Sequence, residues 1–261
     1  MLDIISFLTQ IPVRKDVRIE EVAVRTYLFP FVALLIGLLV AAVAFVVFDC
    51  SGSAPEIAAL LVLLAIYLVT GLMHLDGLAD FFDGVMAGGT EEDKRRAMKD
   101  EKIGIAGLFA TVFVILLSFF AIETVCAGLA KTAHSFDLRS FYHFASIFVI
   151  AEISAKISMN TCMISGKSKE GAGRGMGALF IRSFSKYGYV VTLISAILIS
   201  LIFTAFSLRF FIVFTGIAVA LFVSRIAKSN FGDVGVSGDV IGASNELARC
   251  TTLLVWAIII V

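Results

Sequence analysis

Long apolar runs alternate with short polar segments along the whole of this chain. A helix of about 20 apolar residues spans the hydrocarbon core of a bilayer. Seven runs approach or reach that length, near residues 29–48, 55–73, 104–126, 141–159, 188–206, 209–227 and 244–261. Almost no sequence remains outside them. The pattern therefore predicts an all-α fold, a polytopic integral membrane bundle of about seven transmembrane helices that makes a single domain over residues 1–261.

The composition supports a membrane protein and argues against other classes. Of the 261 residues, 59% are hydrophobic and 16% are charged, whereas a soluble domain carries about 25% charged residues. We therefore expect a lipid bilayer as partner, and because the net charge is zero we expect no nucleic acid. The four cysteines form no C-x-x-C pair, so we expect neither a zinc site nor a disulfide framework.

The N-terminal apolar stretch, residues 4–13, is too short to span a membrane. A basic pair, Arg14 and Lys15, follows this stretch instead of preceding it, which does not fit a signal peptide. We expect an additional N-terminal helix that lies in the membrane interface or dips into the membrane as a re-entrant segment.

Lysine and arginine gather in every second connection between the predicted spans. The N-terminal segment and the loops after the second and fourth spans are basic, and the loop after the sixth begins at Lys228. The intervening connections hold few cations. By the positive-inside rule, the N-terminus and the three polar, glycine-containing loops lie in the cytoplasm, and the C-terminus lies outside. We therefore expect an active site on the cytoplasmic face of the cell membrane.

Three carboxylates follow the second apolar run. Asp76, Asp80 and Asp83 stand at i, i+4 and i+7, so on a helix they share one face. Like charges on one face repel each other and are costly to remove from water, and a divalent cation would offset that cost. Asp oxygens are the hard ligands that Mg²⁺ prefers, and Mg²⁺ commonly brings phosphate-bearing substrates. The pattern predicts a Mg²⁺-dependent phosphotransfer site, with these aspartates as metal ligands and catalytic residues.

Other polar residues of the cytoplasmic loops are candidates for substrate binding. His74 precedes the first aspartate, and its position is equally consistent with an interfacial anchor and with a site residue. Lys99 and Asp100 stand just before the third span, where Asp100 could complete a metal site or orient a basic side chain onto phosphate. Arg174 lies in the basic glycine-rich loop 166–177, which lacks the first glycine of a P-loop but could still wrap a phosphate.

The segment before the last predicted span repeats the acidic pattern with fewer acids. Asp239 and Glu246 are seven residues apart, with Gly242 between them on the same side. We expect them to converge on the acidic helix, with Asp239 as a further metal ligand and Gly242 and Glu246 in substrate binding. The alternative for Glu246 is an ion pair with Arg249.

The fourth predicted span contains two opposite charges. Glu152 and Lys156 are four residues apart. An ion pair across one helical turn is the most economical way to hold both charges in a membrane. We therefore predict that these two side chains pair with each other.

These segments together resemble the cobalamin 5′-phosphate synthases, also called adenosylcobinamide-GDP ribazoletransferases. Residues 70–80 read Thr-Gly-Leu-Met-His-Leu-Asp-Gly-Leu-Ala-Asp and, with Asp83 and Gly84, are similar to the signature of that family. Residues 7–13 look like the N-terminal start of that family. Residues 98–107 look like its second block, and residues 238–247 look like its C-terminal block. Gln10 stands where a basic residue is usual in the family.

The resemblance implies an integral membrane, Mg²⁺-dependent enzyme of the last steps of cobalamin assembly. Such enzymes transfer the phosphocobinamide moiety of adenosylcobinamide-GDP to α-ribazole or its 5′-phosphate and release GMP. A metal held by the three aspartates would neutralise the pyrophosphate and the leaving GMP, and one carboxylate, for which Asp83 is a candidate, would accept the proton of the attacking hydroxyl. Two kinds of protein partner stay open: further copies of this chain in a homo-oligomer, and other corrinoid enzymes.

Two other classes stay open. A CDP-alcohol phosphotransferase also displaces a nucleotide with an acidic helix and a metal, but only the opening of its motif is present, at residues 80–84, without the Ala-Arg that should follow. An ion or metabolite transporter would use the acids as a relay, with acids at mid-membrane and polar positions leading to both faces. An assay of the products discriminates the three classes. Release of a guanosine nucleotide would favour the corrinoid enzyme, and release of a cytidine nucleotide would favour the lipid enzyme. Transmembrane flux without GMP release would favour the transporter.

Overall fold

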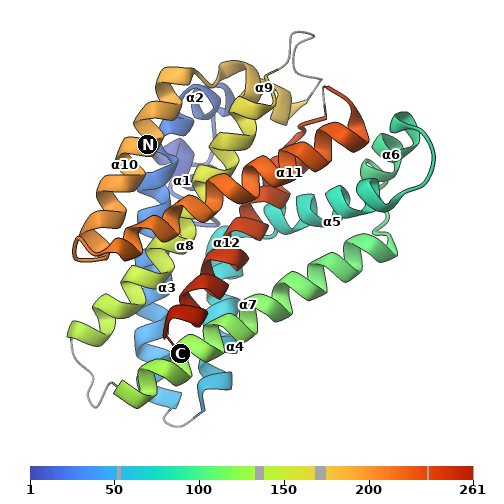
Figure 1. Cartoon of the computed structure of the whole chain (residues 1–261). Helices are drawn as coiled ribbons and strands as arrows, with labels where there is room; N and C mark the ends of the chain where they lie inside the picture. Colours follow the sequence, from blue (N-terminus) through green and yellow to red (C-terminus); the bar gives the residue numbers. More distant parts are fainter. Residues whose placement is uncertain (52–53, 133–137, 168–174, 234, 261) are drawn as a thin grey trace.

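The computed structural model describes residues 1–51, 54–132, 138–167, 175–233 and 235–260, and this part of the chain contains helices and no β-strand (Figure 1). Within these described residues, six helices are long and apolar enough to cross a membrane. A seventh crossing results if Pro55–Thr70 and Met73–Met86, which meet at a bend of 94°, are counted as one broken span. The predicted all-α, polytopic membrane bundle is therefore confirmed.

The described helices are, in chain order, α1 (Leu2–Leu8), α2 (Ile19–Val24), η1 (Thr26–Leu28), α3 (Phe29–Ser51), α4 (Pro55–Thr70), α5 (Met73–Met86), α6 (Glu91–Met98), α7 (Ile105–Thr132), α8 (Leu138–Ser165), α9 (Met176–Ser183), α10 (Lys186–Phe203), η2 (Leu208–Phe214), α11 (Thr215–Phe231) and α12 (Gly238–Ile260). The start expected for the last span, residue 244, is wrong, because α12 already begins at Gly238. The hydroxyl oxygen of Ser237 accepts a hydrogen bond from the backbone N–H of Val240 at 3.4 Å and caps this earlier start. Asp239 therefore lies in the first turn of α12, and Glu246 lies two turns further along it.

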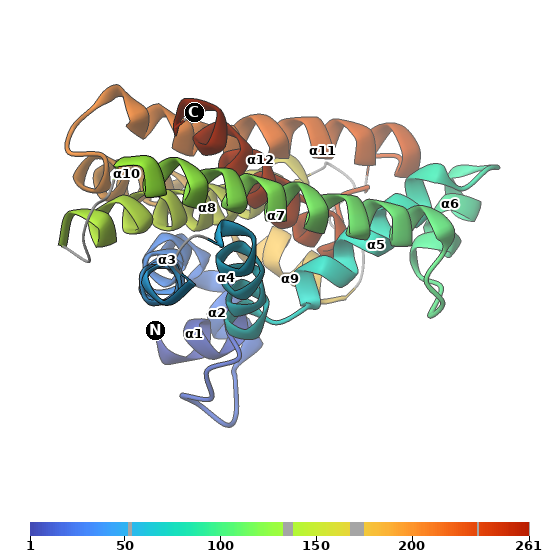
Figure 2. The same cartoon turned by 90° about the horizontal axis from the view of Figure 1, so that it is seen from below.

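Helix α8 forms the centre of the bundle. Its membrane-crossing stretch is 94% buried, whereas those of α3, α7, α10 and α11 are each at most 39% buried. Helices α3, α10, α11 and α12 pack around it (Figures 1 and 2). Because lipid tails are as apolar as the helix surfaces, this packing depends on close van der Waals contact and on polar contacts within the bundle.

The close approach of α3 and α8 depends on Gly37. A Cβ added there would lie 2.5 Å from the Cα of Val149 and 2.7 Å from its backbone nitrogen, so a side chain would push the helices apart. We expect Gly37→Ala to lower the apparent melting temperature of the purified protein by several degrees, because overpacking costs about 1–3 kcal/mol. The matched control is Gly88→Ala, where nothing lies within 4 Å of the added Cβ. Equal melting temperatures of the two variants would contradict this packing.

The bend between α4 and α5 turns the acidic helix away from the axis of α4. Helix α4 ends at Gly71, whose φ of +71° is a conformation that glycine adopts readily. A broken helix is tolerated at membrane depth only where its freed backbone groups find partners. The backbone N–H of Gln10 donates to the carbonyl oxygen of Val69 at 2.7 Å and supplies one such partner. The N-terminal segment, whose helix α1 is too short to cross a membrane, thus supports the break, and α5 packs against α7 and α12.

Helix α6 docks on the end of α11. A capping box between Thr90 and Asp93 starts it, and the hydrogen bonds from the backbone and side chain of Thr90 hold the pKa of the Asp93 carboxyl below its usual range. Arg95 Nε donates to the carbonyl oxygen of Phe231 at 3.0 Å, at the C-terminus of α11, where partial negative charge gathers. Figure 1 shows α6 beside the ends of α5, α7 and α11, so its cations lie at the same end of the molecule as the acidic helix.

Candidate active site

The acidic helix α5 is met by the first turn of α12. The two backbones come together at Gly77, where an added Cβ would lie 3.0 Å from the carbonyl oxygen of Asp239. The charge of the Asp80 carboxylate interacts with those of three other acids, Asp76, Asp239 and Asp83. The structure therefore brings the four predicted metal ligands into one neighbourhood, formed by one face of α5 and the start of α12.

Asp83 also ties α5 to the beginning of α7. Its Oδ2 accepts a hydrogen bond from the backbone N–H of Gly104 at 2.7 Å, and its Oδ1 accepts one from Gly107 at 2.8 Å. A carboxylate at this position satisfies N–H groups that would otherwise lack partners at the N-terminus of a helix. Asp83 thus has a structural contact that the sequence pattern did not predict, in addition to its place on the acidic face.

The donor set suits a hard divalent cation such as Mg²⁺. Among the described residues, no lysine or arginine forms an ion pair with any of the four carboxylates. In the same part of the chain, no group of three or more metal-binding side chains is close enough to hold an ion alone. Because Mg²⁺ is usually bound by one or two carboxylates together with substrate phosphates, a site that the substrate completes fits these residues.

A largely apolar cavity of about 260 Å³ lies beside the carboxylates. We call it the methionine cavity; its large apolar side chains include Phe7, Met73, Met159, Met163, Met176 and Phe180, and its polar side chains are His74, Asp76 and Asp239. These residues come from α1, α5, α8, α9 and α12. The rings of Phe7 and Phe180 stack with their centroids 5.2 Å apart, which joins the walls contributed by α1 and α9.

His74 lines the methionine cavity without a hydrogen-bond partner in the described part of the chain. The residue is 3% exposed, and both Nδ1 and Nε2 are buried and unpaired. Buried polar atoms are nearly always hydrogen-bonded, so an exception needs an explanation. This buried position does not fit the interpretation of His74 as an interfacial anchor.

Lys99 and Asp100 do not line the methionine cavity. They belong to a second, more open cavity of about 390 Å³, whose other side chains are Glu92, Arg95 and Arg96. The charge of Lys99 nevertheless interacts with the Asp239 carboxylate, so this cation is close to the acidic neighbourhood. Arg174, the remaining predicted cation, lies outside the described residues.

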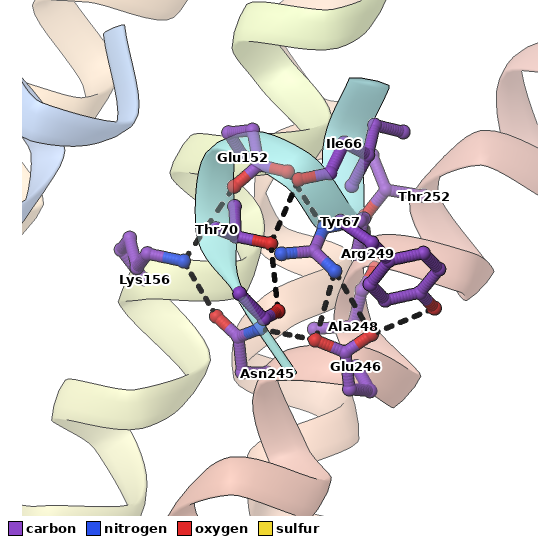
Figure 3. A network of polar contacts seen from close by, with 11 residues as sticks. Ile66, Tyr67, Thr70, Glu152, Lys156, Asn245, Glu246, Ala248, Arg249 and Thr252 are labelled. Atoms are coloured by element: carbon purple, nitrogen blue, oxygen red, sulfur yellow. Dashed lines mark hydrogen bonds and ion pairs between the residues drawn. The ribbon is translucent and has the colours of Figure 1, made fainter. Parts of the chain in front are cut away.

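Glu246 belongs to a buried polar network deeper in the bundle, two turns beyond Asp239 on α12 (Figure 3). Arg249 Nη1 donates to both oxygens of Glu246 at 2.8 Å, and Arg249 Nε donates to Glu152 Oε1 at 2.6 Å. The Tyr67 hydroxyl donates to Glu246 Oε2 at 3.2 Å. The predicted pairing of Glu152 with Lys156 is confirmed at 3.5 Å, and Glu246 makes the alternative pair with Arg249.

The network fixes α12 against its neighbours. Lys156 Nζ donates to Asn245 Oδ1 at 2.7 Å, and Asn245 Nδ2 donates to Glu246 Oε1 at 2.9 Å. Charges at this depth are tolerated when they are paired and hydrogen-bonded. One turn before Glu246, Gly242 allows close packing, since a Cβ there would lie 3.3 Å from the Cα of His74. Gly242 also lines the methionine cavity, and substrate contacts of Gly242 and Glu246 stay predictions.

The sequence pattern missed the walls of the cavity. Met159 and Met163 stand at i, i+4 in α8, a spacing that could have marked one wall but is equally typical of an ordinary helix core. Phe7 and Phe180 are 173 positions apart, and only the packing of α1 and α9 brings them together. Tyr67 showed no pattern that indicated its contact with Glu246.

Known proteins resemble this chain over nearly its whole length. The family model for cobalamin-5-phosphate synthase matches residues 1–257. An adenosylcobinamide-GDP ribazoletransferase of Thermococcus onnurineus is 33% identical over 98% of this chain and 97% of its own length, and one of Methanocella arvoryzae is 39% identical over 95% and 91%. No solved structure matches the chain. The protein therefore belongs to the cobalamin-5-phosphate synthase family and is a multi-pass membrane transferase of cobalamin biosynthesis.

Proposed function

We propose that this protein transfers the phosphocobinamide group of adenosylcobinamide-GDP to α-ribazole or α-ribazole 5′-phosphate and releases GMP. The observation that carries the proposal is the meeting of the α5 carboxylates with Asp239 beside a cavity, in a chain that matches the family from end to end. The names of the relatives support the same substrates. We further propose that residues 1–261 act as one catalytic domain.

The proposed reaction is a single displacement at phosphorus. A ribose hydroxyl oxygen that is free both in α-ribazole and in its 5′-phosphate, and is therefore not the 5′-oxygen, forms a bond to the phosphorus that carries the cobinamide. The anhydride bond between this phosphorus and the GMP phosphate breaks, and GMP leaves with the bridging oxygen. The hydroxyl proton passes to a carboxylate, for which Asp76, Asp80 and Asp83 are the candidates. Two acceptor positions of Asp83 already bind amides, which leaves Asp76 and Asp80 more available.

The carboxylates need a cation before they can accept this substrate. A pyrophosphate would be repelled by four unpaired carboxylates. Mg²⁺ bound among Asp76, Asp80, Asp83 and Asp239, with the substrate phosphates completing its coordination, would supply charge stabilisation to the pyrophosphate and to the leaving GMP. Lys99 adds positive charge beside Asp239, and together with Asp100 it is suited to contact the phosphates of the nucleotide.

The assay that tests this function uses purified protein, adenosylcobinamide-GDP, α-ribazole and Mg²⁺. We expect GMP and the corrinoid nucleotide to form in equal amounts, and a chelator to stop both. Release of CMP from a CDP-alcohol under the same conditions would favour a CDP-alcohol phosphotransferase. Transmembrane flux without nucleotide release would favour a transporter.

We propose that the site faces the cytoplasm of the cell membrane. The basic helix α6 lies at the same end of the molecule as the acidic helix, which supports this orientation through the positive-inside rule (Figure 1). In intact cells, an impermeant thiol reagent should label Leu208→Cys, in the opposite connection η2, and should label Arg96→Cys only after the membrane is opened. Labelling of Arg96→Cys from outside would contradict the orientation.

A further inference from the structure

We propose that Ser237 is a positioning residue for the transfer reaction, whose hydroxyl group orients the Asp239 carboxylate toward a bound cation. The inference rests on the proposed function and adds to it a residue outside the set of carboxylates. Ser237 stands directly before α12 and is not among the described side chains that line the methionine cavity. It acts through Asp239.

The hydroxyl group of Ser237 links the start of α12 to the carboxylate. Ser237 Oγ donates to Asp239 Oδ2 at 3.2 Å and accepts the longer hydrogen bond, at 3.4 Å, from the backbone N–H of Val240. Met98 Sδ also lies 4.0 Å from this oxygen. Because a hydroxyl has one proton and a carboxylate is a much stronger acceptor than a thioether, the proton is directed to Asp239.

The backbone that carries this hydroxyl group is packed on two sides. A Cβ added to Gly177, at the start of α9, would lie 2.7 Å from the Cα of Gly238 and 3.0 Å from the carbonyl carbon of Ser237. The buried side chain of Met98, at the end of α6, reaches the same residue from another helix. Ser237 is therefore held in place before a substrate binds, as a group that orients a metal ligand needs to be.

Asp239 has side-chain freedom that this hydrogen bond restricts. Its backbone packs against α5, since a Cβ added to Gly77 would lie 3.1 Å from the Asp239 Cα. The carboxylate can still rotate about its side-chain bonds. The hydrogen bond to Oδ2 limits that rotation on the side of α12 that meets the acidic helix. The geometry of the carboxylate is thus set by a neighbour in sequence and not by the cation alone.

A neutral donor suits this position better than a cation. Among the described residues, no lysine or arginine forms an ion pair with Asp239. An ion pair would orient the carboxylate but would also offset the charge that attracts Mg²⁺. Asp83 follows the same rule, because the neutral N–H groups of Gly104 and Gly107 hold it. Ser237 therefore orients a metal ligand without reducing its charge.

The test is a double-mutant cycle between Ser237 and Asp239, read as Mn²⁺ binding in the presence of adenosylcobinamide-GDP. We expect Ser237→Ala to weaken Mn²⁺ binding about tenfold, because loss of a group that orients a metal ligand costs about 10–100-fold in affinity. Ser237→Thr keeps the hydroxyl group and should bind within about twofold of the wild type. In the Asp239→Asn background, Ser237→Ala should weaken binding by less than about twofold further, since coupled residues are not additive.

Ser185→Ala is the matched control. The Ser185 hydroxyl oxygen also caps a membrane-crossing helix, α10, by accepting a hydrogen bond from the backbone N–H of Gly188 at 2.9 Å. Within the described chain it donates to no carboxylate, so this control removes a cap alone and should bind Mn²⁺ as the wild type does. Both alanine variants should fold, with apparent melting temperatures lowered by about 2–4 °C for the lost cap.

The outcomes separate this inference from the proposed function, because Mn²⁺ binding needs no turnover. The predicted cycle in a protein that releases no GMP would support the role of Ser237 and contradict the transferase function. Equal Mn²⁺ binding by Ser237→Ala and the wild type, effects of Ser237→Ala and Asp239→Asn that simply add, or a wild type that binds no Mn²⁺ would overturn the role of Ser237. Normal transfer by the wild type in any of these cases would leave the function intact.

Discussion

Replacing Asp80 by asparagine is expected to lower the transfer rate at least about a hundredfold, or ~3 kcal/mol of transition-state stabilisation. The carboxylate of Asp80 lies among those of Asp76, Asp83 and Asp239, so its removal takes one charge from the proposed cation site without changing the size of the side chain. The rate of GMP release at saturating substrate measures the effect, and excess Mg²⁺ should restore only part of it.

A matched control for Asp80→Asn is Glu101→Gln, which removes one charge from an exposed position in the turn before α7. We expect this control to keep the wild-type rate. Both variants should elute as the wild type does in size-exclusion chromatography, since Asp80 makes no ion pair within the described chain. Near-normal turnover of Asp80→Asn at ordinary Mg²⁺ would remove this residue from the catalytic set.

Removing Arg249 should destabilise the protein strongly. Arg249 pairs with both Glu152 and Glu246 in the middle of the bundle, and Arg249→Met leaves two buried carboxylates opposite a single cation, Lys156 (Figure 3). Removing one partner of a buried ion pair typically costs about 3–5 kcal/mol. The apparent melting temperature and the yield of monodisperse protein should both fall sharply, whereas Arg139→Met, at an exposed position, should change neither.

A double variant separates charge balance from simple packing. Adding Glu152→Gln to Arg249→Met leaves one cation, Lys156, and one carboxylate, Glu246, so the buried charges balance again. The double variant should be more stable than Arg249→Met alone, although each substitution by itself destabilises the protein. If the double variant is as unstable as the sum of the two single variants, the charges act independently, and charge balance in the network does not hold α12 in place.

Apart from the approach of Asp239 to the acidic helix, which was expected from their shared membrane face, the features that sequence alone predicted are those that depend on a single helix. The apolar runs indicated the bundle, the spacing of Asp76, Asp80 and Asp83 placed them on one face, and the spacing of Glu152 and Lys156 predicted their pair. In each case helical periodicity connects residues that are close in sequence. Such local patterns therefore survive in the fold.

The features that sequence did not predict depend on several helices together. Gly71 could have signalled the end of α4, but a single glycine does not determine a bend of 94°, which also uses the contact between Gln10 and Val69. Asp239 meets the acidic helix as expected, whereas Glu246, two turns further along α12, lies in the buried network. The methionine cavity needs walls from five helices, and no local pattern contains that information.

The most direct test of the central claim is a measurement of divalent cation binding at the meeting point of α5 and α12. Mn²⁺, whose free form gives a strong electron paramagnetic resonance signal, can replace Mg²⁺ in a titration of purified protein with adenosylcobinamide-GDP, corrected for binding by the substrate alone. The account predicts that the wild type depletes the free Mn²⁺ signal and that Asp80→Asn and Asp239→Asn bind at least about tenfold more weakly. Equal Mn²⁺ binding by the wild type and both variants would contradict it.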